Sequence, residues 1–215
     1  TYTVVAVGKD AFRDVETLGG HVNFPSTITR IGESAFRNTK ITQVTFPQEG
    51  RINIQNYAFN RTAITGTLTI PQSVYYIQSF AFMDCPGITA LVLPETGPNG
   101  GPAQLTIGNS AFMGTGITGT LTIPKGVERI GGDAFQHLKG ITKLVLPQSG
   151  LRVIEGSAFY GTGISGQVTI PSSVTKIGSS AFAGLENMDK LVFAEQGRKY
   201  NLIIDVSAFA NTGIS

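Results

Sequence analysis

The sequence predicts an α/β repeat solenoid, an elongated stack of similar coils, over residues 1–215, and two observations carry this prediction. The dipeptide Ala-Phe occurs nine times, at intervals of 23 to 30 residues. A short alternating apolar segment, closed in most copies by proline, recurs between these dipeptides. One such repeat buries too little apolar surface to fold alone, so the copies must stack. We therefore expect one domain of about 8.5 coils.

The alternating segment predicts a short strand with one buried face. Leu68 and Ile70, or Leu121 and Ile123, stand two residues apart, which is the side-chain period of a strand. Proline lacks the N–H that a sheet ladder requires, so it ends the strand. We expect one short parallel strand in each coil, at residues such as 67–70, 90–93, 120–123 and 143–146.

The Ala-Phe dipeptide marks the other fixed part of each coil. Its regular spacing predicts that the aromatic rings stack on one another in a single buried column when the coils are in register. We expect a short helical turn to hold each dipeptide. The column consists of Phe12, Phe36, Phe59, Phe82, Phe112, Phe135, Phe159, Phe182 and Phe209.

The coils alternate between two kinds, so the true period is a pair of coils. Copies at 62–78, 115–131 and 162–178 resemble the pattern TGITGTLTIPxxVxxIG, whereas 88–97 and 141–150 share ITxLVLPxxG. Extra residues enter only the second kind, at 95–104 and 195–201 in the complete sequence. Both insertions follow the strand, so we expect both on one edge of the solenoid.

The combined pattern, apolar-x-x-apolar-x-apolar-Pro followed by V-x-x-I-G-x-x-A-F, resembles the BspA-like leucine-rich repeats across essentially the whole chain. The resemblance implies a solenoid of leucine-rich-repeat type with parallel strands on one face. Members are surface or secreted proteins of host-associated anaerobic bacteria and parasitic protists. They are implied to be adhesins that bind host matrix proteins or other cells. The chain departs from the family at the position three residues after Phe, where cysteine is common and only Cys85 remains.

Composition and the two termini limit the function classes. A net charge of +2 and the lack of a basic run argue against nucleic acid as a partner. The sequence has no run of 18 apolar residues that would cross a membrane and no signal peptide. The chain starts in mid-coil and stops before a strand, with no polar cap at either end. We therefore expect a fragment of a longer secreted or cell-surface protein, whose open ends could pack end to end.

Candidate catalytic groups are sparse. His21 and His137 lie about five coils apart, too far to share a metal or a catalytic triad. The carboxylates do not recur in facing pairs, and the glycine-rich PNGGPA at 98–103 lacks the lysine of a phosphate loop. Cys85 occupies a slot otherwise filled by Thr, Leu or Val, which indicates a buried structural thiol. We expect no enzyme activity, no metal site and no cofactor.

The outward positions of the predicted strands are the candidate binding residues. They form two columns without an acidic residue, and Lys143 and Lys190 share one column. One interpretation is simple β-propensity, because Thr and Val favour strands everywhere. The other is a docking surface for a host protein or a glycan, with a passive stalk as the alternative role; an enzyme or an ice-binding array is disfavoured. The candidates are His21, Gln43, Thr67, Thr69, Val92, Thr120, Thr122, Lys143, Val145, Gln167, Thr169, Lys190 and Val192.

Overall fold

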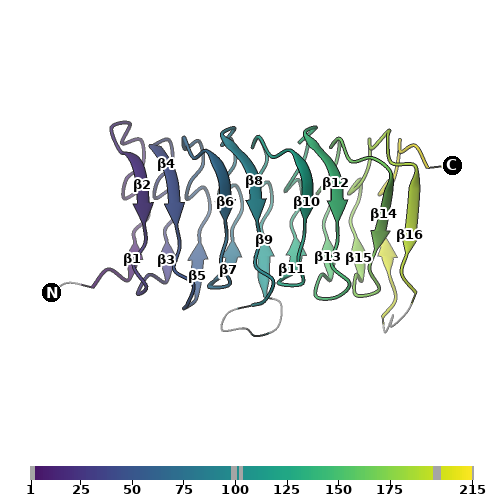
Figure 1. Ribbon diagram of the computed structural model, residues 1–215, viewed down its shortest axis with the longest axis horizontal. Helices are drawn as coiled ribbons and strands as arrows, with labels where there is room; N and C mark the ends of the chain where they lie inside the picture. Colours follow the sequence, from purple (N-terminus) through teal and green to yellow (C-terminus); the bar gives the residue numbers. More distant parts are fainter. Residues whose placement is uncertain (1–2, 98–100, 102–103, 196–199, 215) are drawn as a thin grey trace.

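The chain folds into a solenoid of short parallel strands, as a computed structural model shows for residues 3–97, 101, 104–195 and 200–214. Successive coils stack along one axis, with strands on two opposite sides (Figure 1). The described residues contain 17 strands and no helix. The insertions expected at 95–104 and 195–201 fall largely outside the described residues.

One side of the solenoid is a single nine-stranded sheet, hereafter the continuous sheet. Every strand pairs in parallel with the equivalent strand of the adjacent coil, and the buried isoleucines align in one row, as Ile130 aligns with Ile154. Its strands are β1 (Ala6–Val7), β3 (Arg30–Ile31), β5 (Ile52–Ile54), β7 (Val74–Ile77), β9 (Leu105–Ile107), β11 (Val127–Ile130), β13 (Val153–Ile154), β15 (Lys176–Ile177) and β17 (Ile203–Ile204).

The opposite side carries the strands that the alternating pattern predicts, but here they pair only two by two. We call this side the paired-strand face. Its four two-stranded sheets separate at regular intervals, which Figure 1 shows as wider spaces between neighbouring pairs. The pairs are β2 (Gly19–Asn23) with β4 (Lys40–Thr45), β6 (Gly66–Thr69) with β8 (Ile88–Val92), β10 (Gly119–Thr122) with β12 (Ile141–Val145), and β14 (Gln167–Ile170) with β16 (Lys190–Phe193).

The prediction of one strand per coil is therefore incomplete, since each full coil carries two. In β7 and β11 this second strand breaks the period of two, whereas β5 and β9 keep it. In β11 the buried Val127 and Ile130 are three residues apart, with the partly exposed Glu128 and the exposed Arg129 between them. A register shift between Val127 and Arg129 absorbs the extra residue. This bulge hides the strand from an alternation rule.

The prediction of helical turns at Ala-Phe is wrong. Ser34 and Asn38 flank the Ala35-Phe36 pair with φ of 53° and 57°, which a helix cannot contain. Phe36 N donates to Ala58 O of the next coil at 2.8 Å, whereas Ala35 N donates within the turn to Gly32 O at 3.1 Å. Alternate amides thus bond between coils instead of along a helix. The turns therefore continue, at the edge of each coil, the hydrogen bonding between adjacent coils that the strands make on the two sides.

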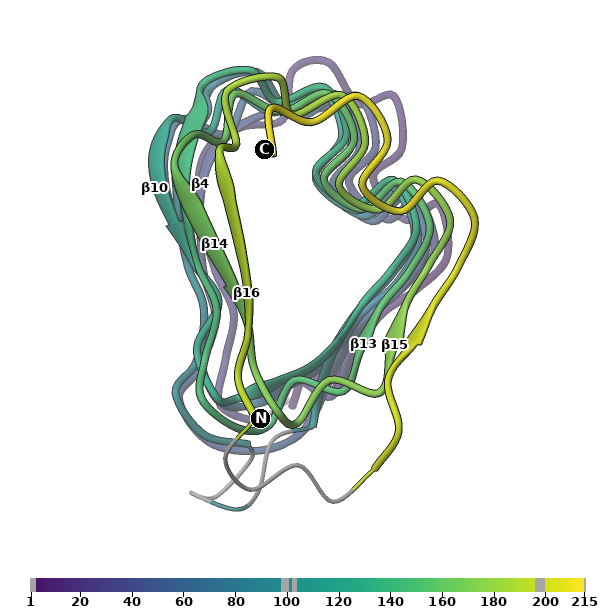
Figure 2. The same ribbon diagram turned by 90° about the vertical axis from the view of Figure 1, so that its right-hand side faces the viewer.

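The predicted aromatic column is confirmed. Neighbouring rings lie 5.2 to 5.6 Å apart between centroids, and each stacked pair is within 18° of parallel. The rings from Phe36 to Phe182 are at most 3% exposed, whereas Phe12 in the first coil is 40% exposed. Figure 2 shows the coils superposed along the axis, with the two strand-bearing sides converging around the interior that holds this core.

The slot three residues after each Phe has a polar role in several coils. Thr39, Thr115 and Thr162 are buried, and their hydroxyls donate to the carbonyl oxygen of the preceding Phe at 2.7 to 3.0 Å. Cys85 occupies the same slot in another coil, and its Sγ donates at 3.1 Å to the carbonyl oxygen of Phe59 in the preceding coil. Threonine and cysteine therefore share this slot because each satisfies a carbonyl while filling little space.

Candidate binding face

The thirteen predicted residues all lie on the outward side of the paired-strand face. Twelve of them are exposed and Val192 is partly exposed, while their neighbours Leu68, Leu121 and Val168 are buried. Cross-strand registers align them: Thr120 stands beside Lys143, and Gln167 beside Lys190. The alternation of the sequence thus places each of these side chains correctly, while their role in binding stays a prediction.

A column of glycines opens the intervals between the strand pairs. One glycine stands within two residues of the start of the first strand of each pair, with φ between 69° and 80°. Within β2, β6 and β10 a register shift follows it directly. This left-handed conformation is accessible to glycine at low cost and turns the strand away from the coil before it. The glycines are Gly20, Gly66, Gly119 and Gly166.

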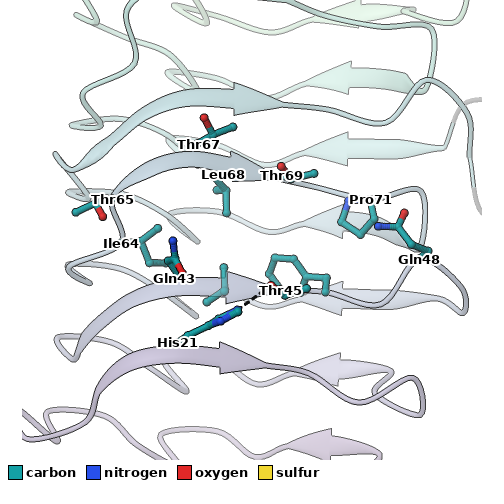
Figure 3. A pocket seen from close by; sticks show the side chains of 12 residues that line it. His21, Gln43, Thr45, Gln48, Ile64, Thr65, Thr67, Leu68, Thr69 and Pro71 are labelled. Carbon is teal, nitrogen blue, oxygen red and sulfur yellow. Dashed lines mark hydrogen bonds between the residues drawn. The ribbon is translucent and has the colours of Figure 1, made fainter.

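Grooves lie in two of the three intervals between these strand pairs. The first, about 340 Å³, lies between β4 and β6 and is lined by Gln43, Thr45, Thr67 and Thr69 (Figure 3). The second, about 590 Å³, lies between β12 and β14. In the first groove His21 Nε2 lies 2.8 Å from Thr45 Oγ1 across the β2–β4 pair. The grooves are open to solvent, so they suit a partner that lies along the surface.

The electrostatics of the two sides differ. Along the continuous sheet, Arg129 Nη2 lies 2.6 Å from Glu155 Oε1, and Lys176 Nζ lies 3.4 Å from Glu155 Oε2 and 3.7 Å from Asp205 Oδ2. On the paired-strand face, Lys143 and Lys190 are exposed and form no ion pair with any described residue. The outward columns there therefore carry uncompensated positive charge.

The groups that sequence analysis weighed for chemistry lie apart from one another. His137 packs edge-on against Tyr160, with ring centroids 5.1 Å apart, and His21 lies on the paired-strand face. Cys85 is buried, and burial raises the pKa of its thiol, which keeps it protonated and unreactive. Within the part of the chain that the structure describes, no three His, Cys, Asp or Glu side chains group as metal ligands would.

Sequence reasoning missed the grooves and one further hollow. The grooves depend on the breaks between strand pairs, which a list of outward side chains does not reveal. The glycine in TGITG, which has a positive φ, is the sequence feature that marks such a break. The hollow, about 510 Å³, lies on the continuous sheet, where the smaller Thr106 stands between Tyr76 and Arg129. It depends on the pairing of β9 with the two bulged strands β7 and β11, whose bulges the alternation rule does not find.

No described helix has the length and apolar character that crossing a bilayer requires. No match is found among curated proteins.

Solved structures resemble this chain to different degrees. A leucine rich cell surface protein from Faecalibacterium prausnitzii A2-165 is 20% identical, with a TM-score of 0.50 over 97% of this chain and 75% of that chain. The leucine rich repeat protein of T. pallidum is 19% identical, with a TM-score of 0.46 over 93% and 72%. The pneumococcal vaccine antigen PcpA is 15% identical, with a TM-score of 0.40 over 98% and 74%. At these identities the first likeness shows the fold alone.

The family assignment comes from the sequence pattern that forms the continuous sheet and the paired-strand face. The model of the BspA type leucine rich repeat region matches residues 1–99 and 105–215, in six copies. These ranges include the alternating strands, the bulged strands and the Ala-Phe turns of every coil. The chain therefore belongs to the BspA type leucine rich repeat family.

Proposed function

We propose that this chain is the binding segment of a secreted or cell-surface protein, and that it docks a partner on the paired-strand face without catalysis. The partner would be a host matrix or cell-surface protein or a glycan, as for an adhesin. The family supports a surface role, as does the cell surface protein from Faecalibacterium prausnitzii that shares the fold. Repeat solenoids commonly bind through an extended surface of regularly spaced side chains.

One observation carries the choice of face. The paired-strand face presents Lys143 and Lys190, which form no ion pair with a described residue, in columns without an acid, whereas Arg129 and Lys176 of the continuous sheet pair with acids. Uncompensated charge draws in a partner of opposite sign and sets its orientation. Val145 and Val192 each stand two residues after Lys143 or Lys190 on the same strand, and they would add apolar contact.

The test is a pull-down of host matrix and serum proteins on this segment, repeated with the double variant Lys143→Glu plus Lys190→Glu. We expect weaker binding and a flatter salt dependence, because exposed charges act mainly on the association rate. The free energy of unfolding should change by less than about 0.5 kcal/mol, as is usual for exposed positions. Unchanged binding to the captured partner would exclude this face.

The matched control is Lys125→Glu plus Lys139→Glu. These two lysines are exposed in turns outside the strands, and their reversal changes net charge by the same amount. We expect the control to bind as the unaltered protein does. Equal losses in both double variants would show that total charge, not the paired-strand face, drives the interaction.

The uninterrupted ladder of the continuous sheet favours a second role, a stiff spacer that presents a neighbouring domain. A spacer contributes length alone. Deletion of these coils from the full-length protein would then reduce cell adhesion, while the lysine reversal would leave adhesion intact. A binding segment predicts that both changes reduce it.

A further inference from the structure

The hollow on the continuous sheet interrupts a row of outward side chains. It lies at β9, which stands between β7 and β11 in the middle of this sheet (Figure 1). Thr106 of β9 is in register with Tyr76 on one side and with Arg129 on the other. Two long side chains are therefore two strand spacings apart, about 9.6 Å, with a short one between them. The hollow of about 510 Å³ occupies this step.

A second step in the same row shows why the one at β9 stays open. Val153 also stands between two long basic side chains of the adjacent strands. Glu155, two residues later, fills that step, because its carboxylate forms ion pairs with both Arg129 and Lys176. The equivalent residue after β9 is Gly108, which has no side chain to do the same. The step at β9 is therefore left open to a ligand.

Tyr76 places an aromatic ring without a partner at one wall of the hollow. It is 37% exposed, and no described ring or cation packs against it. Other tyrosines are engaged. Tyr57 stacks on Phe80 with ring centroids 4.7 Å apart, and Tyr75 packs against a guanidinium 4.6 Å from its centroid. An exposed ring of this kind is a platform on which a ligand ring can stack.

Hydrogen-bonding groups line the rest of the hollow. Asn109 Oδ1 accepts a backbone N–H of the next coil at 3.0 Å, which orients the amide and leaves its NH₂ without a described partner. Glu155 holds Arg129 through Nη2, and no described residue bonds Nη1 or Nε. The hydroxyls of Ser79 and Thr106 likewise bond no described side chain or backbone group. The hollow thus combines one aromatic wall with several donors and acceptors.

A pyranose ring of glucose type matches this combination. When every hydroxyl is equatorial, both ring faces present C–H groups that stack on an aromatic face, while the hydroxyls lie around the edge. At a stacking distance of about 3.5–4.0 Å from Tyr76, the ring would lie near the level of Thr106, in the space that this short side chain leaves. A purely aromatic ligand would leave the surrounding polar groups unpaired, which costs affinity. Arg129 already pairs with Glu155, so a neutral sugar suffices.

We propose that this hollow binds a neutral, glucose-type sugar ring of a glycan. Tyr76 stacks on one face of the ring, and Thr106, Asn109 and Arg129 bond its hydroxyls. The site lies on the side of the solenoid opposite the paired-strand face, so the inference goes beyond the proposed function and does not depend on it. The sugar would complete the outward row where the chain supplies no large side chain.

The test titrates methyl β-D-glucopyranoside into the protein and follows the backbone amide signals by NMR. We expect a Kd of about 1–10 mM, the range for one small ring. The signals that shift should belong to residues 76–79 and 106–109, which border the hollow. This map needs no variant, so it stays informative if a substitution prevents folding.

Four variants separate stacking from other effects. Tyr76→Ala removes the platform and should weaken binding at least about tenfold, whereas Tyr76→Phe keeps the ring and should bind within about twofold. Thr106→Tyr fills the step and should abolish binding; the row already holds a tyrosine at position 76. Tyr200→Ala is the matched control, because Tyr200 is exposed and lies outside the hollow, and it should bind as the unaltered protein does.

The proposal is overturned if the glucoside binds more weakly than about 10 mM, if the shifts fall outside the hollow, or if Tyr76→Ala binds as tightly as Tyr200→Ala. N-acetylphenylalaninamide represents the rival occupant, an aromatic side chain of a partner protein. Its binding in the hollow without binding of the glucoside would also overturn the sugar. Lys143→Glu plus Lys190→Glu should leave glucoside binding unchanged, so this site and the docking face can fail separately.

Discussion

The continuous sheet and the paired-strand face are built by the same coils, yet one is uninterrupted and the other breaks after every second strand. Glycines accompany both arrangements, but on one side they allow coils to approach closely and on the other they let the strand turn away. Directly after strands of the continuous sheet, a Cβ on Gly131 would lie 2.5 Å from the carbonyl carbon of Gly108, so glycine there permits close stacking. On the paired-strand face, Gly119 has a φ of 72° and open space around its Cβ position. Glycine there turns the strand and opens a groove.

This difference would separate stability from the proposed recognition. The continuous sheet and the aromatic column hold adjacent coils together, while grooves open between strand pairs of the paired-strand face. Outward residues of the paired-strand face can vary without disturbing the hydrogen bonds of the continuous sheet, which hold the coils together. The predictions below test this separation, from the largest expected effect to the smallest.

The largest effect is expected in the core that both faces share. Phe135 is fully buried and stacks between Phe112 and Phe159, so Phe135→Ala should lower the free energy of unfolding by about 3–5 kcal/mol. Phe12→Ala should cost less, because Phe12 is 40% exposed and stacks on one ring alone. Urea unfolding followed by circular dichroism measures both. Equal losses would mean that the first coil is covered in solution.

The next effect separates the two kinds of glycine. Gly131→Ala forces a methyl group against backbone atoms of Gly108 and Asn109 and should cost about 3 kcal/mol. Gly119→Ala meets no atom within 4 Å and should cost only about 1 kcal/mol, from its left-handed backbone. The same unfolding assay compares them. A larger loss at Gly119 would show that the bulge, not the close stacking, limits stability.

The smallest effect is expected at the ion pairs of the continuous sheet. Glu155 contacts both Arg129 and Lys176, and Glu155→Gln should cost at most about 1 kcal/mol because the partners are partly exposed. The loss should shrink in high salt, which screens the pairs. Thermal unfolding at two salt concentrations tests this. A loss that is independent of salt would assign Glu155 a packing role instead.

The sequence predicts the paired-strand face better than the continuous sheet. Leu68 and Ile70 alternate cleanly, so their strand and the outward Thr69 follow from period two alone. Val127 and Ile130 are separated by a bulge, and Ser34 has a positive φ in the Ala-Phe turn for which a helical turn is predicted. Both depend on hydrogen bonds to the next coil, which a single repeat cannot reveal. The grooves likewise depend on where two coils fail to pair.

The central claim, that one face is fully laddered while the other is open at every second strand, is tested most directly by residue-resolved amide exchange in the unliganded protein. Ile70 N bonds Val92 O and Gly131 N bonds Ile107 O, so both amides should exchange slowly. The Thr69 amide, one residue away, faces the groove and should exchange at least about a hundredfold faster, as expected for an N–H outside any ladder. Comparable protection at Thr69 and Ile70 would show that β4 and β6 pair in solution, and would contradict the account.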